Sequence, residues 1–351
     1  MANVWSTPDL LRPTERPGAA HRFGAAVEWW LRRNLDGIPC EGLFRVSDDW
    51  LLLASDLQAC EQLWHKTMVT LEEFGFVANR LPGKSVAPCQ CLTWCGLEYD
   101  SVGMTVRLPA DKVRKALALA EHFRTAGTAT RAELDSLFGY MVFCSAVVFG
   151  IKAFLHSVRR LRYRSELTTL PGSRLVRIPE SVRLDMQWVV NNLAKFNGDR
   201  RVPIVASGWS GPFSEAFIDA RGASGGVGIF LEGAFVGLTG AQCNAMFPAG
   251  GPISSPGTWD VPSEVANHWE LFAFVVLLYL FGPVLVNQVL RVQSDSVTAI
   301  RCVRDVSAAL DSPELAALTK IFLTLCVDYN IRVEACHIPG DRNILADPLS
   351  R

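Results

Sequence analysis

Four carboxylates in the C-terminal part of the sequence lie in or next to apolar segments, where a folded chain would bury or half-bury them. Asp219 ends an apolar segment of strand-like pattern, Glu270 lies inside an apolar helix-like segment, Asp295 ends a second strand-like segment, and Asp347 opens a last short helix-like segment. A buried or half-buried carboxylate needs a partner, and four acids from four elements share one only if the fold brings them together. Each acid alone would more often be a helix cap or an exposed strand end, but the set of four predicts a common site.

A divalent cation is the partner that such a set would share. Oxygen ligands without His or Cys suit Mg²⁺ or Mn²⁺. A cluster of carboxylates can hold two such ions about 3.5–4 Å apart, which suits displacement at a phosphodiester. We therefore expect Asp219, Glu270, Asp295 and Asp347 to be catalytic residues that bind two Mg²⁺ or Mn²⁺ ions.

The elements that must position these acids follow a regular order along residues 209–351. Three strands that can pair antiparallel come first, and helices alternate with strands after them. This order predicts a mixed sheet with helices on its faces. The predicted strands cover residues 214–222, 225–233, 234–240, 290–296 and 330–340, and the predicted helices include 263–281 and 343–351.

The first two hundred residues predict helices, one hairpin and a few short strands. The hairpin over 44–54 carries two adjacent acids, Asp48 and Asp49, at its tip. A helix with Ser55 as its cap follows, and the pattern from 111 to about 164 is helical throughout. The other predicted elements are a short amphipathic helix over 24–36, strands within 91–100 and 104–109, and a helix over 181–196.

Composition excludes several classes of protein and places basic residues in the middle of the chain. The 351 residues are 49% hydrophobic with a net charge of -1, which is enough for two or three packed cores and excludes disordered and collagen-like chains. Residues 101–210 hold 17 Lys and Arg against 8 Asp and Glu, whereas residues 211–351 hold 8 against 14. After a long apolar run, a basic cluster marks either a solvated helix end or a phosphate-contacting surface. The cluster is Arg159, Arg160, Arg162 and Arg164.

Cysteine usage and hydropathy predict an intracellular protein, in the cytoplasm or the nucleus, without a membrane partner. The ten cysteines are scattered through apolar segments, which is not the pattern of a disulfide scaffold. Residues 271–290 carry no charge and are long enough to span a bilayer. Gly282 and Pro283 interrupt this stretch and Asn287 and Gln288 lie inside it, so a buried helix followed by a buried strand is favoured.

Four motifs carry a resemblance to a known family. FIDA, HWELFAF, QSDS and HIPGDRNILADPLSR resemble, in order and spacing, the acidic motifs of the ribonuclease H domain of retrotransposon polyproteins, and the ending is most similar to DIRS-like, tyrosine-recombinase elements. The resemblance implies that residues 209–351 form a ribonuclease H-like domain that cleaves the RNA strand of RNA–DNA hybrids with Mg²⁺ or Mn²⁺. It assigns the metal ligands to Asp219, Glu270, Asp295 and Asp347, and makes Asn343 a substrate-contacting or orienting residue.

The upstream sequence resembles the reverse transcriptase of the same kind of element. HRFGAAVEWWLRRNLDGIPCEGLFRVSDDWLLLA resembles the helix and Y-x-D-D hairpin of the polymerase palm, with Asp48 and Asp49 as the two acids. GFVANRLPGKS resembles the next palm turn, with Lys84, and LTWCGLEYD resembles the primer-grip hairpin. The resemblance divides the chain into a truncated palm (1–100), a thumb-like helical region (101–165), a connection (166–208) and the ribonuclease H-like domain.

The departures from a reverse transcriptase concern the polymerase site. A palm needs a further carboxylate on an earlier strand, since two metal ions must bridge the attacking hydroxyl and the triphosphate. Before Asp48 the only aspartates are Asp9 and Asp36, and neither lies on an apolar strand. We therefore expect ribonuclease H activity without polymerase activity in this chain. Two alternatives stay open: a polymerase completed by upstream sequence, and a non-enzymatic remnant that binds an RNA–DNA hybrid or another nucleic acid.

Overall fold

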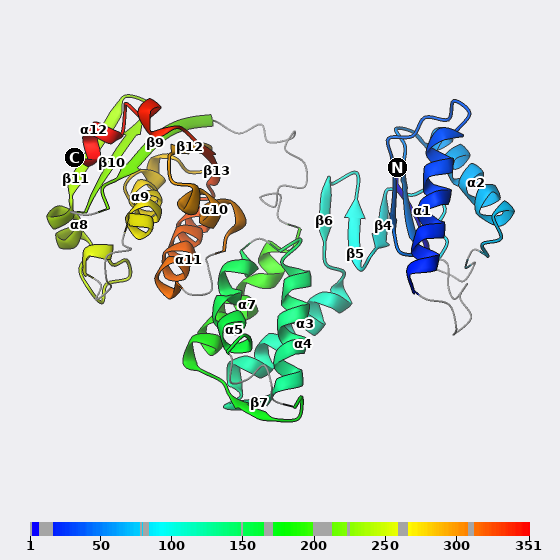
Figure 1. The fold of residues 1–351 in the computed structure, drawn as a ribbon, viewed down its shortest axis with the longest axis horizontal. Coiled ribbons are helices and arrows are strands. Elements are labelled where there is room, and N and C mark those ends of the chain that lie inside the picture. The colour runs from blue at the N-terminus through cyan, green and yellow to red at the C-terminus, as the bar shows by residue number, and fades with distance from the viewer. Residues whose placement is uncertain are drawn as a thin grey trace. The chain divides into compact units, whose positions relative to one another are not determined.

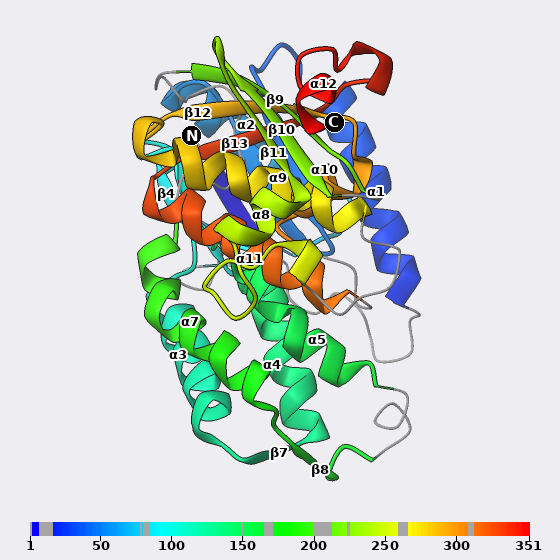
Figure 2. The same ribbon diagram turned by 90° about the vertical axis from the view of Figure 1, so that its left-hand side faces the viewer.

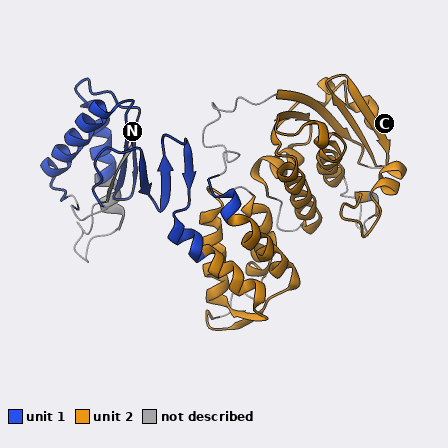
Figure 3. Cartoon of the chain, turned by 180° about the vertical axis from the view of Figure 1, so that it is seen from behind, with its two compact units in different colours: residues 1–115, 194–204 blue, residues 116–193, 205–351 orange. Residues whose placement is uncertain are grey.

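The described residues form two compact units, which Figure 3 colours separately. The computed structural model describes residues 2–6, 17–77, 79, 84–148, 150–164, 171–198, 213–222, 225–258, 266–307 and 312–351. The first unit is Met1–Lys115 with Ala194–Ile204, and the second is Ala116–Leu193 with Val205–Arg351. Most of the patternless segment between 6 and 24, part of GFVANRLPGKS and parts of the predicted connection lie outside the described residues. The four-part division of the chain stays a prediction.

The first unit contains two small antiparallel sheets and two helices. The predicted hairpin is present, with its turn at Ser47 in the left-handed region (φ 57°). The second helix is capped by Asp56 rather than by Ser55, because Asp56 Oδ1 accepts a hydrogen bond from the backbone N–H of Ala59 at 2.8 Å. The elements are β1 (Ala2–Ser6), α1 (Pro17–Arg33), β2 (Gly42–Val46), β3 (Asp49–Leu53), α2 (Leu57–Glu73), β4 (Cys91–Trp94), β5 (Leu97–Asp100) and β6 (Thr105–Arg107), in sheets of order β1-β3-β2 and β4-β5-β6.

The helical region from 110 to 196, which follows the first two sheets in the sequence, is less continuous than its sequence pattern indicates. A two-stranded pair, β7 with β8, interrupts the predicted run of helix, because Thr130 ends β7 and starts α4 with a capping box to Glu133. The elements are α3 (Ala110–Thr125), β7 (Thr128–Thr130), α4 (Arg131–Cys144), η1 (Ile151–Leu155), α5 (His156–Arg162), β8 (Leu175–Arg177) and α7 (Glu180–Phe196).

The C-terminal part of the second unit holds the predicted five-stranded mixed sheet (Figure 1, Figure 2). Its order is β11-β10-β9-β12-β13, with β9 to β11 antiparallel and β12 parallel to both of its neighbours. The chain runs through β9 (Phe213–Ala220), β10 (Gly226–Leu231), β11 (Ala234–Thr239), α8 (Gly240–Met246), η2 (Pro256–Thr258), α9 (Ala266–Phe281), η3 (Gly282–Val284), β12 (Val289–Ser294), α10 (Val297–Asp305), α11 (Pro313–Asp328), β13 (Arg332–His337), η4 (Gly340–Arg342) and α12 (Asp347–Ser350). Helix α8 was not expected from the pattern.

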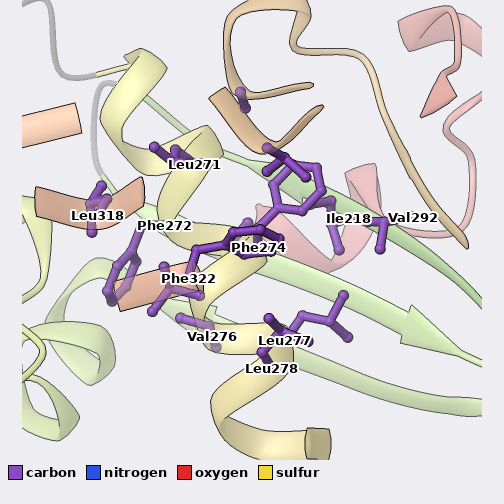
Figure 4. Close-up of a cluster of buried hydrophobic side chains, with 14 of the residues drawn as sticks. Ile218, Leu271, Phe272, Phe274, Val276, Leu277, Leu278, Val292, Leu318 and Phe322 are labelled. Atoms are coloured by element: carbon purple, nitrogen blue, oxygen red, sulfur yellow. The ribbon is translucent and has the colours of Figure 1, made fainter. Parts of the chain in front are cut away.

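The core of this part is built around α9. Every side chain from Leu271 to Leu278 is fully buried, and they pack against Ile218 of β9, Val292 of β12 and Phe322 of α11 (Figure 4). By length and composition, Ala266–Val284 is the one helix among the described residues that could cross a membrane. Its apolar residues instead fill the centre of this core, which is the buried helix that the sequence predicts.

Candidate metal centre

Three of the four predicted acids meet at one place in the second unit. Asp219 lies in β9, Glu270 lies about one turn into α9, and Asp295 follows the end of β12. One carboxylate oxygen from each lies within 4.8 Å of the other two. The strand register explains part of this: β12 and β9 pair in parallel up to Gln293 and Phe217, and two residues further each strand reaches its aspartate.

Burial raises the pKa of two of these carboxyl groups. Asp219 is 7% exposed, and its burial raises its pKa, a shift to which Asp295 and Asp347 add and which a hydrogen bond from Ser350 opposes. Burial raises the pKa of Glu270 to about 8, with further contributions from Asp295 and Asp219. Without a cation, this raised pKa favours the protonated form of Glu270 at neutral pH.

The donor set fits a hard divalent cation. The Oε2 atom of Glu270 is buried and has no hydrogen-bond partner among the described residues, which is costly for a carboxylate unless a cation takes that position. Over the described part of the chain, the triad is the one group of three or more His, Cys, Asp or Glu residues placed to hold a metal ion. Asp219, Glu270 and Asp295 would hold it, with Mg²⁺ or Mn²⁺ favoured by the all-oxygen ligands.

Asp347 opens α12 as predicted but is not in the triad. Its Oδ1 accepts hydrogen bonds from the guanidinium of Arg351, with 2.7 Å to Nη2 and 3.2 Å to Nε. The arginine stands four residues later, so a cation is available one helical turn away. Asp347 lies near enough to raise the pKa of Asp219. Its place among the metal ligands stays a prediction.

Asn343 is a buried anchor for the segment that carries Asp347. Its side chain is fully buried, its Nδ2 donates to the carbonyl of Ile218 at 2.9 Å, and its own backbone carbonyl accepts from the N–H of Asp347 at 3.1 Å. A fully buried side chain has no surface for a nucleic acid. Of the two roles predicted for Asn343, the orienting role agrees with this geometry and direct substrate contact does not.

Ser350 is a site residue that the sequence pattern does not reveal. Its hydroxyl donates to Asp219 Oδ2 at 2.5 Å and lies 3.0 Å from the carbonyl oxygen of Asp347. The contact joins residues 131 positions apart. A small polar residue near the end of a short helix gives no periodic signal, and only its place in the motif that ends in Leu-Ser-Arg could have drawn attention to it.

The two acids of the palm-like hairpin form a different kind of site in the first unit. Asp48 is exposed in the turn, and Asp49 is half-buried at the start of β3. Burial raises the pKa of Asp49, Asp48 raises it further, and the positive charge of Lys84 lowers it. No third carboxylate joins this pair among the residues that the structure describes.

The predicted basic surface of the helical region is smaller than its sequence indicates. Arg162 is held by Asp135, with 2.6 Å from Nε to Oδ1, and its guanidinium lies over the ring of Phe138. Arg160 and Arg164 are exposed and Arg159 is half-buried. These three arginines, rather than all four, remain candidates for phosphate contact.

Comparison with known proteins gives likeness to solved structures alone. No protein-family model matches the chain, and no curated protein matches it. It is similar to the foamy viral protease-reverse transcriptase in complex with dsDNA, at 12% identity and a TM-score of 0.45, over 97% of this chain and 67% of that one. A second structure of that viral protein, labelled dRH and also bound to double-stranded DNA, matches at 13% identity and a TM-score of 0.41. The match covers 90% of the present chain but only 48% of the length of the viral chain.

A third match covers a smaller share of the chain. RNase H1 from the halophilic archaeon Halobacterium salinarum NRC-1 is 18% identical with a TM-score of 0.29, over 39% of this chain and 94% of that one. The similar structures are thus of the reverse transcriptase and ribonuclease H kinds, and they leave the DIRS-like resemblance a prediction. Because each of these three TM-scores is below 0.5, the function has to be judged from the residues of this chain.

Proposed function

We propose that this chain is a metal-dependent nuclease that cleaves the RNA strand of RNA–DNA hybrids, derived from a retroelement of DIRS-like type. Its reverse-transcriptase-like part is inactive alone, and the protein acts inside the cell. The observation that carries the proposal is the Asp219–Glu270–Asp295 triad: three carboxylates from separate elements within 4.8 Å of one another. The five-stranded mixed sheet that positions them supports the same assignment.

The three carboxylates of the triad would act together as metal ligands. Asp219, Glu270 and Asp295 would hold the metal, which when bound would activate a water for in-line attack on a phosphodiester and offset charge on the leaving 3′ oxygen. Because the pKa of Glu270 is about 8 without metal, its carboxyl carries a proton at pH 7 and must release it to become a ligand. Burial of Asp219 keeps bulk water from this carboxylate, and Ser350 fixes the direction of its Oδ2.

Substrate binding would be electrostatic and independent of sequence. Arg159, Arg160 and Arg164 in the second unit, and Lys84 in the first, are the residues that we assign to phosphate contact. A hybrid would be recognised by groove shape and by 2′-hydroxyl groups rather than by base edges. Binding should therefore weaken as the salt concentration rises.

Cleavage of a labelled RNA–DNA hybrid in Mg²⁺ or Mn²⁺ tests the proposal. Asp219→Asn should lose about 100- to 1,000-fold in rate, the scale of losing electrostatic stabilisation at a reacting centre, because the amide is a far poorer metal ligand. Asp305→Asn, the same change at an exposed acid of α10, is the matched control and should cleave like the wild type. Full metal-dependent cleavage by the Asp219→Asn protein would contradict the assignment.

Two other outcomes of the same assay point to the alternatives. Binding of the hybrid by the wild type without any cleavage favours a non-enzymatic nucleic-acid-binding remnant. Primer extension by the same preparation favours a polymerase and shows that another residue completes the site at Asp48 and Asp49.

A further inference from the structure

The hydroxyl of Ser350 contacts Asp219, one of the three triad carboxylates. It is 5% exposed and donates to Asp219 Oδ2 at 2.5 Å, and this hydrogen bond lowers the pKa of Asp219 against the effect of burial. The serine is held in place by its own helix, since its N–H donates to the carbonyl of Ala346 at 3.2 Å.

Glycines in the neighbouring strands let this helix approach the sheet. Gly228 pairs with Asp219 across β10 and β9. A Cβ atom on Gly228 would collide with the carbonyl oxygen of Ala346 and lie 2.7 Å from the N of Ser350, and a Cβ on Gly237 would lie 2.7 Å from the carbonyl oxygen of Leu349. These are backbone atoms, so they cannot move aside as a flexible side chain would. The absence of side chains on these glycines is therefore what allows α12 to lie against β10 and β11 with Ser350 at Asp219.

We propose that Ser350 is a positioning residue for Asp219: its hydroxyl fixes the carboxylate rotamer and so raises the affinity of the triad for a divalent cation. The inference rests on the proposed metal site. A carboxylate oxygen has two lone pairs, and the hydrogen bond uses one of them on Oδ2, which leaves the other lone pair and all of Oδ1 for a metal. Hydrogen-bonding groups behind metal ligands typically change metal affinity by about 10- to 100-fold.

The opposite role for Ser350, competition with the metal, can be tested in the same way. If Ser350 occupied the position of the metal instead of supporting its ligand, removal of the hydroxyl would increase metal affinity. The sign of the change in affinity therefore distinguishes a support from a competitor.

Titration of the 351-residue chain with Mn²⁺, monitored by isothermal titration calorimetry, tests the inference without any activity measurement. Ser350→Ala should bind Mn²⁺ about 10-fold more weakly than the wild type, and Ser350→Thr should recover most of the affinity because it restores the hydroxyl. Ser254→Ala removes a serine hydroxyl that bonds to a loop carbonyl, that of Pro248, and should leave affinity unchanged. Far-UV circular dichroism confirms that each variant is folded at the assay temperature.

Gly228→Ala gives a second route to the same question. It should weaken Mn²⁺ binding by displacing Ser350 although the serine itself is kept. Gly139→Ala is the matched control, because a Cβ there meets nothing within 4 Å.

The outcomes separate this inference from the proposed function. Ser350→Ala binding Mn²⁺ as tightly as the wild type, or more tightly, would overturn the inference alone. A wild type that binds Mn²⁺ no better than Asp219→Asn would overturn the proposed function, and the inference with it.

Discussion

The described residues of the second unit include carboxylates buried at Asp185 and at the triad, and the charges beside Asp185 and Glu270 are opposite in sign. Asp185 of α7 is 4% exposed; Lys320 of α11 forms an ion pair with it and Ser157 donates a hydrogen bond to it. Burial raises the pKa of Asp185, and these two neighbours act against the shift. Glu270, in contrast, has two further acids beside it, and the groups that shift its pKa all raise it. The protein supplies a cation, Lys320, beside Asp185, whereas under the proposed function a metal would take the corresponding position beside Glu270.

The Asp185–Lys320 pair lies in a joint between the helical region and the sheet-bearing part of the unit. Phe154 of η1 stacks on Trp188 of α7 with ring centroids 3.9 Å apart, and the ammonium of Lys320 lies 5.4 Å from the Phe154 ring centroid. Gly150 comes so close that a Cβ on it would lie 2.7 Å from a methyl of Leu323 in α11. Apolar packing and the ion pair therefore hold these helices to α11.

Removal of the cation at the joint should produce the largest change in stability. Lys320→Met leaves Asp185 buried without its cation, and loss of one member of a buried pair typically costs about 3–5 kcal/mol. Lys152→Met, the same substitution at an exposed lysine of η1, is the control and should change stability by less than about 0.5 kcal/mol. Urea unfolding of the full chain measures both. Equal midpoints for the two variants would mean that the joint contributes little, and the contrast with the triad would then fail.

The triad and its sheet are predictable from the sequence because both depend on local pattern. Apolar alternation marks the strands, and an acid at the end of such a strand is conspicuous, which is why the sequence alone singles out Asp219 and Asp295. The mixed character of the sheet follows from three adjacent strands and alternating helices, whereas the order of its strands was not predicted. The interruption at β7 escapes prediction because three residues are too few to show a period.

Long-range polar contacts could not be predicted in the same way. Ser350 reaches Asp219, and Lys320 reaches Asp185 over 135 positions; nothing in the local pattern around either residue shows which acid it will meet. Asp347 shows a related difficulty, since its pairing with Arg351 competes with the site that the motif predicts. Which partner a polar side chain contacts depends on the folded backbone, and the local sequence pattern does not show it.

The triad should make the metal-free protein less stable as the pH rises. The pKa of Glu270 is raised from 4.5 to about 8 in the fold. The folded state therefore binds more protons than the unfolded state between these values, and its free energy of unfolding falls as the pH increases through that window. The loss should be about 3 kcal/mol between about pH 5 and 8.5, given 1.36 kcal/mol per pKa unit and a discount for solvent relaxation.

Urea unfolding in EDTA across this pH range measures the effect, and Glu270→Gln should remove most of the slope. Saturating Mg²⁺ should also oppose it, because the metal binds the deprotonated form. An Asp305→Asn variant, which changes an exposed acid of α10, keeps the triad and should retain the wild-type slope over the same pH range. A wild-type protein whose metal-free stability is flat over this range would show that Glu270 is already ionised and that the triad tolerates its charge without a cation.

Substitution of the two hairpin acids should have the smallest effect on cleavage and stability. Asp48 and Asp49 are neighbours in one turn, one of them exposed, with Lys84 near enough to lower the pKa of Asp49. Such a pair is stable without a metal, and two carboxylates are too few for the two ions of a polymerase. The double variant Asp48→Asn with Asp49→Asn should therefore cleave an RNA–DNA hybrid within about twofold of the wild-type rate and change stability by about 0.5 kcal/mol or less. Primer extension should be absent from both proteins. Primer extension that the wild type shows and the double variant lacks would contradict this prediction. A third ligand would then reach this pair from a part of the chain outside the described residues, or from another chain. The first unit would in that case hold a second catalytic centre.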